Sequence, residues 1–335
     1  MRFGLRVPAC ESSNEVADLI VRAEQGGFDY AWMPDTQLLN RDLWITLGAA
    51  ATRTSKIALG PNVTNPVTRH PTVTASAAVT LDELSAGRCV LGIGSGESSV
   101  HVMGRKAATL AELRESVELM RKLWEGRWVA PHGPSFHLQY ASGRRVPVYI
   151  AASRPRMLQL AGEVADGVIM VTGISEEALD YGFTNIEIGA CRAGRRPEDL
   201  DIAVGAYCHF GPDRRAAAKQ ARPFAALYAL RYRGTERDFG VAIPDGFGIS
   251  SLYPDLLHAE DWDRAIEITD WVPNTALEAF ADEWCLLGSG EQAVEKIRRL
   301  ESYGVNNLYL RGFYTYDLPT DTCETLVDQV IPHFR

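Results

Sequence analysis

Polar and glycine-rich turns follow five of the strands that the sequence predicts. These turns are residues 34–37, 61–66, 94–97, 152–155 and 172–173. Glycine and small polar side chains let a ligand approach the backbone closely, although each turn alone is also typical of an ordinary connection between a strand and a helix. Together they predict a ligand site where the carboxyl ends of parallel strands meet.

Side chains that can exchange a proton lie in or beside these turns. Asp35 and Glu97 supply carboxyl groups, and His101 follows Glu97 at helical spacing. The His101 imidazole either points into the same cleft or faces solvent. His70 precedes Pro71 at the start of a predicted helix, so we interpret it as a capping residue and not as a base. Asp35, Glu97 and His101 are therefore side chains of this region that are able to carry a proton.

Composition and charge exclude several classes of partner. The formal net charge is −9, and Lys and Arg are scattered, which argues against a nucleic-acid partner. No apolar run approaches the roughly 18 residues that a membrane span requires. The first residues show no signal-peptide core, so we expect a cytoplasmic protein without a membrane partner.

Motifs of other enzyme classes are missing from the sequence. The six cysteines are far apart and none forms a C-x-x-C pair, so a zinc site or a redox pair is unsupported and we expect no bound metal. We find no Ser-His-Asp arrangement, phosphate-binding loop or metal-ligand helix. Tyr228 and Tyr232 are candidates for an aromatic pocket, whereas Trp32 is expected in the core.

Short apolar runs alternate with longer helical patterns along the whole chain. The predicted strands are residues 1–7, 30–33, 57–60, 89–93, 147–152, 167–171, 202–207 and 307–310. Helical patterns, such as those over residues 13–25, 43–52, 72–84 and 109–125, separate the strands, and Ser289 with Gln292 predicts the capped start of a later helix. This strict alternation predicts an α/β protein with a single (β/α)8 TIM barrel.

Two longer segments interrupt the alternation. Residues 126–146, after the fourth strand, are rich in Gly, Pro and aromatic residues and predict a hairpin-like excursion. Residues 231–281, after the seventh strand, carry turn signals and a helical stretch, and we expect them to cover the active face of the barrel. Both are interpreted as insertions in one domain that spans residues 1–335.

Four segments carry a resemblance to a known family. They are LGPNVTNPVTRHPTVTASAAVTLDELSAGRCVLGIGSGE (59–97), RESVELMRKLWEG (114–126), PVYIAASRPRMLQLAGEVADGVI (147–169) and LLGSGEQAVEKIRRLESYGVNNLYL (286–310). The chain resembles the methylenetetrahydromethanopterin reductases, which are deazaflavin F420-dependent members of the luciferase-like superfamily. The resemblance covers nearly the whole chain and weakens over residues 231–281.

The resemblance implies a cofactor site built from the strand-end turns. A bulge with a non-prolyl cis peptide is implied at Asn62–Val63, beneath the cofactor ring, with Thr64 at the ring edge and Asp35 on its pyrimidine side. Gly94, Ser95, Gly96 and Glu97 match the loop near the ring and the ribityl chain. A phosphate is implied at Ala151, Ala152, Ser153 and Arg154, with Thr172 and Gly173 completing its pocket.

Thr36 is a departure from the family pattern. Relatives that use F420 often have histidine at this position, next to the reacting carbon. A hydroxyl cannot act as an acid near neutral pH, since its pKa lies far above the value of about 6.5 for imidazole. Either the substrate needs no proton from this position, or Glu97, His101 or Asp35 supplies it. The candidate catalytic residues are therefore Asp35, Thr36, Glu97 and His101.

Three functions are compatible with these residues. The first is hydride transfer between F420 and a small organic substrate that has an electrophilic carbon. The second is a two-component monooxygenase that uses reduced FMN and oxygen, with a separate reductase supplying the reduced flavin. The third is a cofactor-free binding protein. The resemblance also implies a homodimer.

Overall fold

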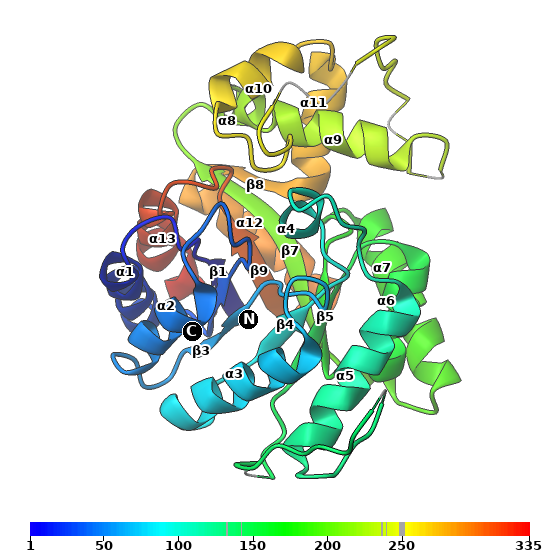
Figure 1. Cartoon of the computed structure of the whole chain (residues 1–335). Coiled ribbons are helices and arrows are strands. Elements are labelled where there is room, and N and C mark those ends of the chain that lie inside the picture. The colour runs from blue at the N-terminus through cyan, green and yellow to red at the C-terminus, as the bar shows by residue number, and fades with distance from the viewer. Residues whose placement is uncertain (132, 142, 236, 239, 248–251) are drawn as a thin grey trace.

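The computed structural model describes the whole chain except residues 132, 142, 236, 239 and 248–251. Its described strands are all parallel and form one sheet (Figure 1). They are β1 (Arg2–Arg6), β2 (Tyr30–Met33), β3 (Ala58–Pro61), β4 (Leu91–Ile93), β5 (Val148–Ala152), β6 (Gly167–Met170), β7 (Asp201–Phe210), β8 (Cys285–Gly288) and β9 (Asn307–Arg311). The order is β3-β2-β1-β9-β7-β6-β5-β4, and β8 pairs with β7 outside this path.

The sheet closes into a barrel between β3 and β4. Isolated parallel bridges join Leu59 to Cys89 and Thr64 to Ile93. The backbones approach so closely here that a Cβ atom on Gly60 would lie 1.8 Å from the Val90 carbonyl oxygen, and one on Gly92 would lie 2.2 Å from the Pro61 carbonyl oxygen. Glycine at these two positions is therefore what allows the barrel to close.

Helices connect the strands and cover the outside of the barrel (Figure 1). The connecting helices are α1 (Ser13–Gln25), α2 (Leu43–Ala51), α3 (Pro71–Leu84), α4 (Ser98–His101), α5 (Leu110–Trp124), α6 (Pro155–Val164), α7 (Glu176–Arg192) and α12 (Gly290–Ser302). A 3-10 turn, η1 (Pro197–Asp199), precedes β7, and α13 (Thr320–Thr325), the π-turn η3 (Leu326–Val330) and the 3-10 turn η4 (Ile331–Phe334) end the chain. Ser289 and Gln292 form a capping box at the start of α12, which confirms the predicted cap.

Aromatic and polar side chains fill the amino-terminal half of the barrel interior. The Asp201 carboxylate accepts hydrogen bonds from Arg2, Tyr30, Tyr149 and Asn307, at 2.6–3.1 Å for the shortest contact of each. Above this cluster, Trp32 stacks on Tyr30 and meets Tyr149 edge-on. Trp32 is fully buried, as the sequence predicts. Side chains therefore fill the amino-terminal half of the barrel interior, and only the carboxyl-terminal half has room for a ligand.

The connection from β7 to β8 forms a separate layer over the carboxyl ends of the strands. It contains α8 (Arg214–Gln220), α9 (Arg222–Tyr232), α10 (Trp262–Ile268) and α11 (Asn274–Trp284), which lie at the top of Figure 1. Its own apolar cluster includes Phe224, Phe280 and Trp284. This layer confirms that an insertion covers the predicted active face.

The structure differs from the sequence predictions at the margins of the insertion. The helical layer runs from Arg214 to Trp284, beyond the predicted limits of 231 and 281, because α8 and most of α9 lie before residue 231. Strand β8 is not among the eight predicted strands. Its four residues directly follow α11, so no turn in the sequence marks where the strand begins, and it pairs only with the end of β7. The predicted hairpin in residues 126–146 is supported by an antiparallel bridge between Val129 and Phe136.

We predict that Gly60→Ala destabilises the protein by about 3 kcal/mol, because the added methyl group would overlap the backbone oxygen of Val90, directly before β4. Gly211→Ala is the matched control, since its Cβ atom would have nothing within 4 Å. Urea unfolding followed by circular dichroism measures both. Equal stability of the two variants would contradict the close approach of β3 and β4.

Candidate active site

A cavity of about 370 Å³ opens at the carboxyl ends of the strands, beneath the helical layer. Twelve of the residues proposed from the sequence line it: Asp35, Thr36, Asn62, Val63, Gly94, Ser95, Gly96, Glu97, Ala151, Ala152, Ser153 and Arg154. They come from the turns after β2, β3 and β4, from the end of β5 and from the turn after it. The structure therefore brings together most of the site that the sequence predicts.

The turn after β3 bulges into this cavity. Five residue steps separate the bridged positions Leu59 and Thr64, but only four separate their partners Cys89 and Ile93, so this strand carries one extra residue. The peptide bond between Asn62 and Val63 is cis, as the resemblance implies. The Asn62 side-chain nitrogen is buried, and no atom in the described part of the chain accepts a hydrogen bond from it.

Asp35 is held in a fixed position beside the bulge. Its carboxylate accepts a hydrogen bond of 2.7 Å from the Thr64 hydroxyl and one of 3.1 Å from Nε of Arg69. Burial raises the pKa of the Asp35 carboxyl, although Arg69 and Thr64 oppose that shift. Thr36 lies next to it and also lines the cavity.

Two arginines connect the turns after β4 and β5 to the helical layer. Glu97 forms an ion pair with Arg231 of α9. Arg154 donates a hydrogen bond of 3.0 Å to the Arg231 carbonyl oxygen and directly precedes α6. The amino-terminal end of a helix and a guanidinium group thus lie together in the loop where a phosphate is predicted.

A second polar network joins Ser98 of α4 to Asp255 and His258 of the connection between β7 and β8. The Ser98 hydroxyl donates a hydrogen bond of 2.5 Å to Asp255, and Nδ1 of His258 lies 2.9 Å from that hydroxyl and 3.1 Å from Asp255. Burial alone would raise the pKa of the Asp255 carboxyl, but its contacts with His258 and Ser98 lower it to about 2. Ser98 and His258 both line the cavity, so this network joins the layer to the strand ends.

Several predicted residues lie outside the cavity lining. His101 is exposed on α4, and Thr64 is buried behind the bulge, where it contacts Asp35. Thr172 and Gly173 directly follow the lining residue Val171 but do not line the cavity themselves. The Thr172 hydroxyl is buried and has no hydrogen-bond partner among the described residues. His70 accepts a hydrogen bond from the Thr72 backbone, which confirms that it is a cap.

The lining residues that were not predicted from the sequence include Arg6, Tyr207, His258 and Arg311. A signal for two of them was present. Arg6 and Arg311 are charged residues at the ends of otherwise apolar strand segments, FGLR and LYLR. His258 carried no such signal, since it lies in an irregular stretch between α9 and α10. Tyr228 lines the cavity, as the sequence suggested.

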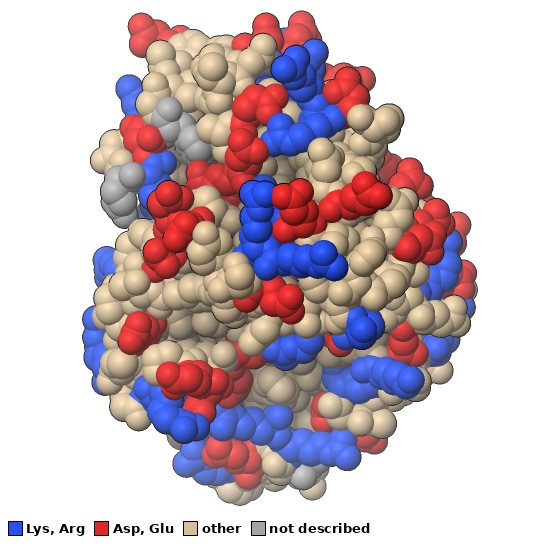
Figure 2. Space-filling model, turned by 180° about the vertical axis from the view of Figure 1, so that it is seen from behind, with Lys and Arg blue, Asp and Glu red and all other residues tan. Residues whose placement is uncertain are grey.

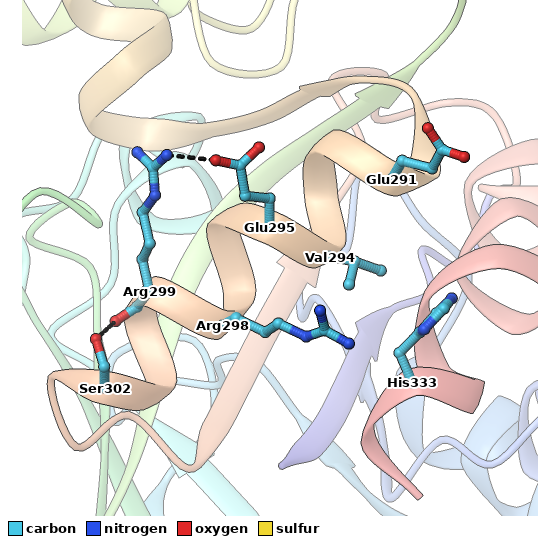
Figure 3. Close-up of a pocket in the computed structure, with 7 residues that line it drawn as sticks. All are labelled: Glu291, Val294, Glu295, Arg298, Arg299, Ser302 and His333. Carbon is cyan, nitrogen blue, oxygen red and sulfur yellow. Dashed lines mark hydrogen bonds and ion pairs between the residues drawn. The ribbon is translucent and has the colours of Figure 1, made fainter.

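Other hollows on the surface lack this chemistry. A shallow groove of about 490 Å³ lies between α12 and His333, and within it Glu295 and Arg299 pair with each other (Figure 3). Acidic and basic residues are interspersed over the face shown in Figure 2. The described residues contain no cluster of His, Cys, Asp and Glu that could hold a metal ion. Nor does any described helix combine the length and apolar character of a membrane span.

Comparison with known proteins decides the family. The family model described as luciferase-like monooxygenase matches residues 1–307. The chain belongs to the luciferase-like monooxygenase family. This luciferase-like protein is therefore an oxidoreductase, and the resemblance stated from the sequence is confirmed.

This luciferase-like protein is similar to two relatives, and to the solved structure of another protein, over almost their full length. It is 31% identical to the 5,10-methylenetetrahydromethanopterin reductase of Archaeoglobus fulgidus over 92% of each chain. It is 32% identical to the F420-dependent glucose-6-phosphate dehydrogenase of Nakamurella multipartita, over 92% of this chain and 89% of the relative. The solved coenzyme F420-dependent tetrahydromethanopterin reductase of Methanopyrus kandleri has 26% identity and a TM-score of 0.73, covering 100% of this chain and 99% of that one.

We predict that Asp255→Asn lowers the free energy of unfolding at pH 7 by up to about 2 kcal/mol, because the carboxylate has a lower pKa when folded than when unfolded. That contribution is fully present above the unfolded pKa of 3.8 and is lost as the pH falls through the folded pKa of about 2. The gap between wild type and variant should therefore narrow below pH 4. Urea unfolding of both proteins between pH 7 and pH 3 measures it, and a constant gap would be evidence against the network.

Proposed function

We propose that this protein is an F420-dependent oxidoreductase in which a hydride passes between the deazaflavin and a small organic substrate. The observation that carries the proposal is the cavity itself, which is lined by both the bulge at Asn62–Val63 and the loop at Ser153–Arg154. Two relatives of known activity that share 31% and 32% identity support the cofactor, since one is named F420-dependent and the other is a methylenetetrahydromethanopterin reductase.

The residues in the cavity fit a planar ring with a phosphate tail. The unpaired Asn62 side-chain nitrogen is a hydrogen-bond donor for a ring carbonyl. Gly94 lets the turn after β4 approach the bulge closely, because a Cβ atom there would lie only 3.0 Å from Val63 Cγ2. Arg154 and the start of α6 would hold the phosphate. The bound group would supply the hydride donor or acceptor.

The protein's own residues have three tasks in this proposal. Val63 and Gly94 position the ring against the substrate. Asp35, fixed by Thr64 and Arg69, orients the ring edge. The helical layer, through Tyr228 and His258, narrows the entrance and keeps water out of the cavity.

A proton must come from another residue than Thr36 if the substrate needs one. Asp35 and Glu97 both line the cavity, and the raised pKa of Asp35 makes it the better proton carrier of the two. Glu97 is committed to Arg231, and His101 lies outside the lining. We therefore place the proton transfer at Asp35, with Thr36 as a hydrogen-bonding partner of the substrate.

A monooxygenase that uses reduced FMN is the second candidate, because the matching family model carries that name. Such chemistry needs the flavin N5 atom, which a deazaflavin replaces by carbon, so the two candidates require different cofactors. It would also need a separate reductase. A cofactor-free binding protein fits less well, since it would leave the buried Asn62 donor unsatisfied.

We expect F420 to bind at least tenfold more tightly than FMN. The chain is 32% identical to a relative named for F420, and the cavity has a bulge and a basic loop suited to the ring and its phosphate. Fluorescence titration of the purified protein with each cofactor measures both affinities. Tighter binding of FMN, followed by oxygen-dependent turnover with a reductase, would establish the monooxygenase instead.

A substitution beside the bulge tests the position of the ring. Gly94→Val should weaken F420 binding at least tenfold, because its side chain would press against Val63 and displace the bulge that is proposed to contact the ring. Gly211→Val adds the same group where nothing lies within 4 Å and should bind F420 like the wild type. Circular dichroism melting confirms that both variants fold. Unchanged binding in a folded Gly94→Val variant would place the ring elsewhere.

A further inference from the structure

Two arginines stand side by side at the ends of neighbouring strands. Arg6 ends β1 and Arg311 ends β9, and the parallel register pairs Leu5 with Leu310, one residue before each of them. Residues at matching positions of paired strands point to the same face of a sheet. Both side chains line the cavity, so they project into the barrel from one wall.

Neither guanidinium group has a counter-charge bound to it. Arg6 is only 4% exposed and makes no hydrogen bond or ion pair with any described residue. The Nε and one Nη atom of Arg311 are buried and also lack a partner within the described part of the chain. Arg311 is held instead by packing over the Tyr207 ring, 4.7 Å from its centroid. Buried arginines without a partner are rare in folded proteins.

The carboxylates of the cavity are occupied by other groups. Glu97 pairs with Arg231, and Asp35 accepts from Arg69. Asp255 is the carboxylate whose charge reaches Arg311, but Ser98 and His258 occupy its oxygens. The wall formed by Arg6 and Arg311 therefore has an excess of positive charge.

Both arginines remain charged at neutral pH. Burial, and next the charge of Arg311, lower the pKa of the Arg6 guanidinium to about 10, which is still well above 7. Two like charges in a confined cavity repel each other, and a bound anion that accepts from both relieves that repulsion.

We propose that Arg6 and Arg311 form a subsite for an anionic group of the substrate, either a carboxylate or a phosphate. Guanidinium groups bind both of these groups through paired hydrogen bonds. The inference rests on the proposed function, because it assigns the substrate to the wall that the cofactor leaves free. In the barrel order, β1 and β9 lie opposite β4 and β5, whose loops are proposed to hold the cofactor. The anion is therefore assigned to the substrate and not to the cofactor's phosphate.

Binding of simple anions tests this subsite. Inorganic phosphate and propionate are titrated separately into the protein at constant ionic strength, and the melting temperature is followed, since a ligand of the folded state raises it. We expect a saturable rise with at least one of the two anions. In Arg6→Met and in Arg311→Met, the affinity for that anion should fall at least tenfold. The anion that raises the melting temperature at the lower concentration identifies phosphate or carboxylate as the preferred group.

Three controls make each outcome informative. Arg298→Met removes an exposed arginine of α12 and should leave anion binding unchanged. Arg6→Lys keeps the charge and should retain part of the affinity, which separates loss of the anion site from misfolding. F420 titrations of the same variants should match the wild type.

Two results would overturn the subsite. One is the absence of a saturable response to both anions in the wild type, and the other is an unchanged response in the Arg6→Met and Arg311→Met variants. If these variants lose F420 and anion binding together, the pair serves the cofactor and the assignment to the substrate is wrong. If the wild type binds the anion through this pair but does not bind F420, the result supports the subsite and contradicts the proposed cofactor.

Discussion

The close approach of β3 and β4 determines how the site is built. Gly60 and Gly92 let the two backbones come within van der Waals contact just below the strand ends. Pairing between the two segments resumes at Thr64, and the segment of β3 has one more residue between the two bridges than the segment of β4. Because the strand cannot spread sideways there, the extra residue is pushed inward at Asn62–Val63. The shape of the cavity floor follows from this steric constraint.

The rest of the barrel divides the cavity into two walls of different chemistry. Trp32 and the residues around Asp201 fill the lower interior, so a ligand can enter only from the carboxyl ends. The bulge and the loops after β4 and β5 form one wall, which is rich in small residues and backbone. Arg6 and Arg311 on β1 and β9 form the opposite wall. In the proposed function the cofactor and the substrate meet between these walls, since hydride transfer requires the reacting atoms to be held close together.

The sequence predicted the barrel, and twelve of its candidate site residues line one cavity, because both depend on local patterns. Alternating apolar runs fixed the strands, and the turn at residues 61–66 carried a recognisable family pattern. The other wall depends on contacts between distant segments. Arg6 and Arg311 are 305 positions apart and become neighbours only when β1 pairs with β9. His258 reaches the cavity through the insertion, where the resemblance is weakest, and β8 is too short and one-sided to give a strand pattern of its own.

A crystal structure of the protein with bound F420 is the most direct measurement of the central claim. The account predicts the deazaflavin ring against Asn62 and Val63, its phosphate at Ser153 and Arg154, and open space between the ring and the two arginines at the ends of β1 and β9. A ring bound on the β1 and β9 side, with its phosphate on Arg6 and Arg311, would contradict it.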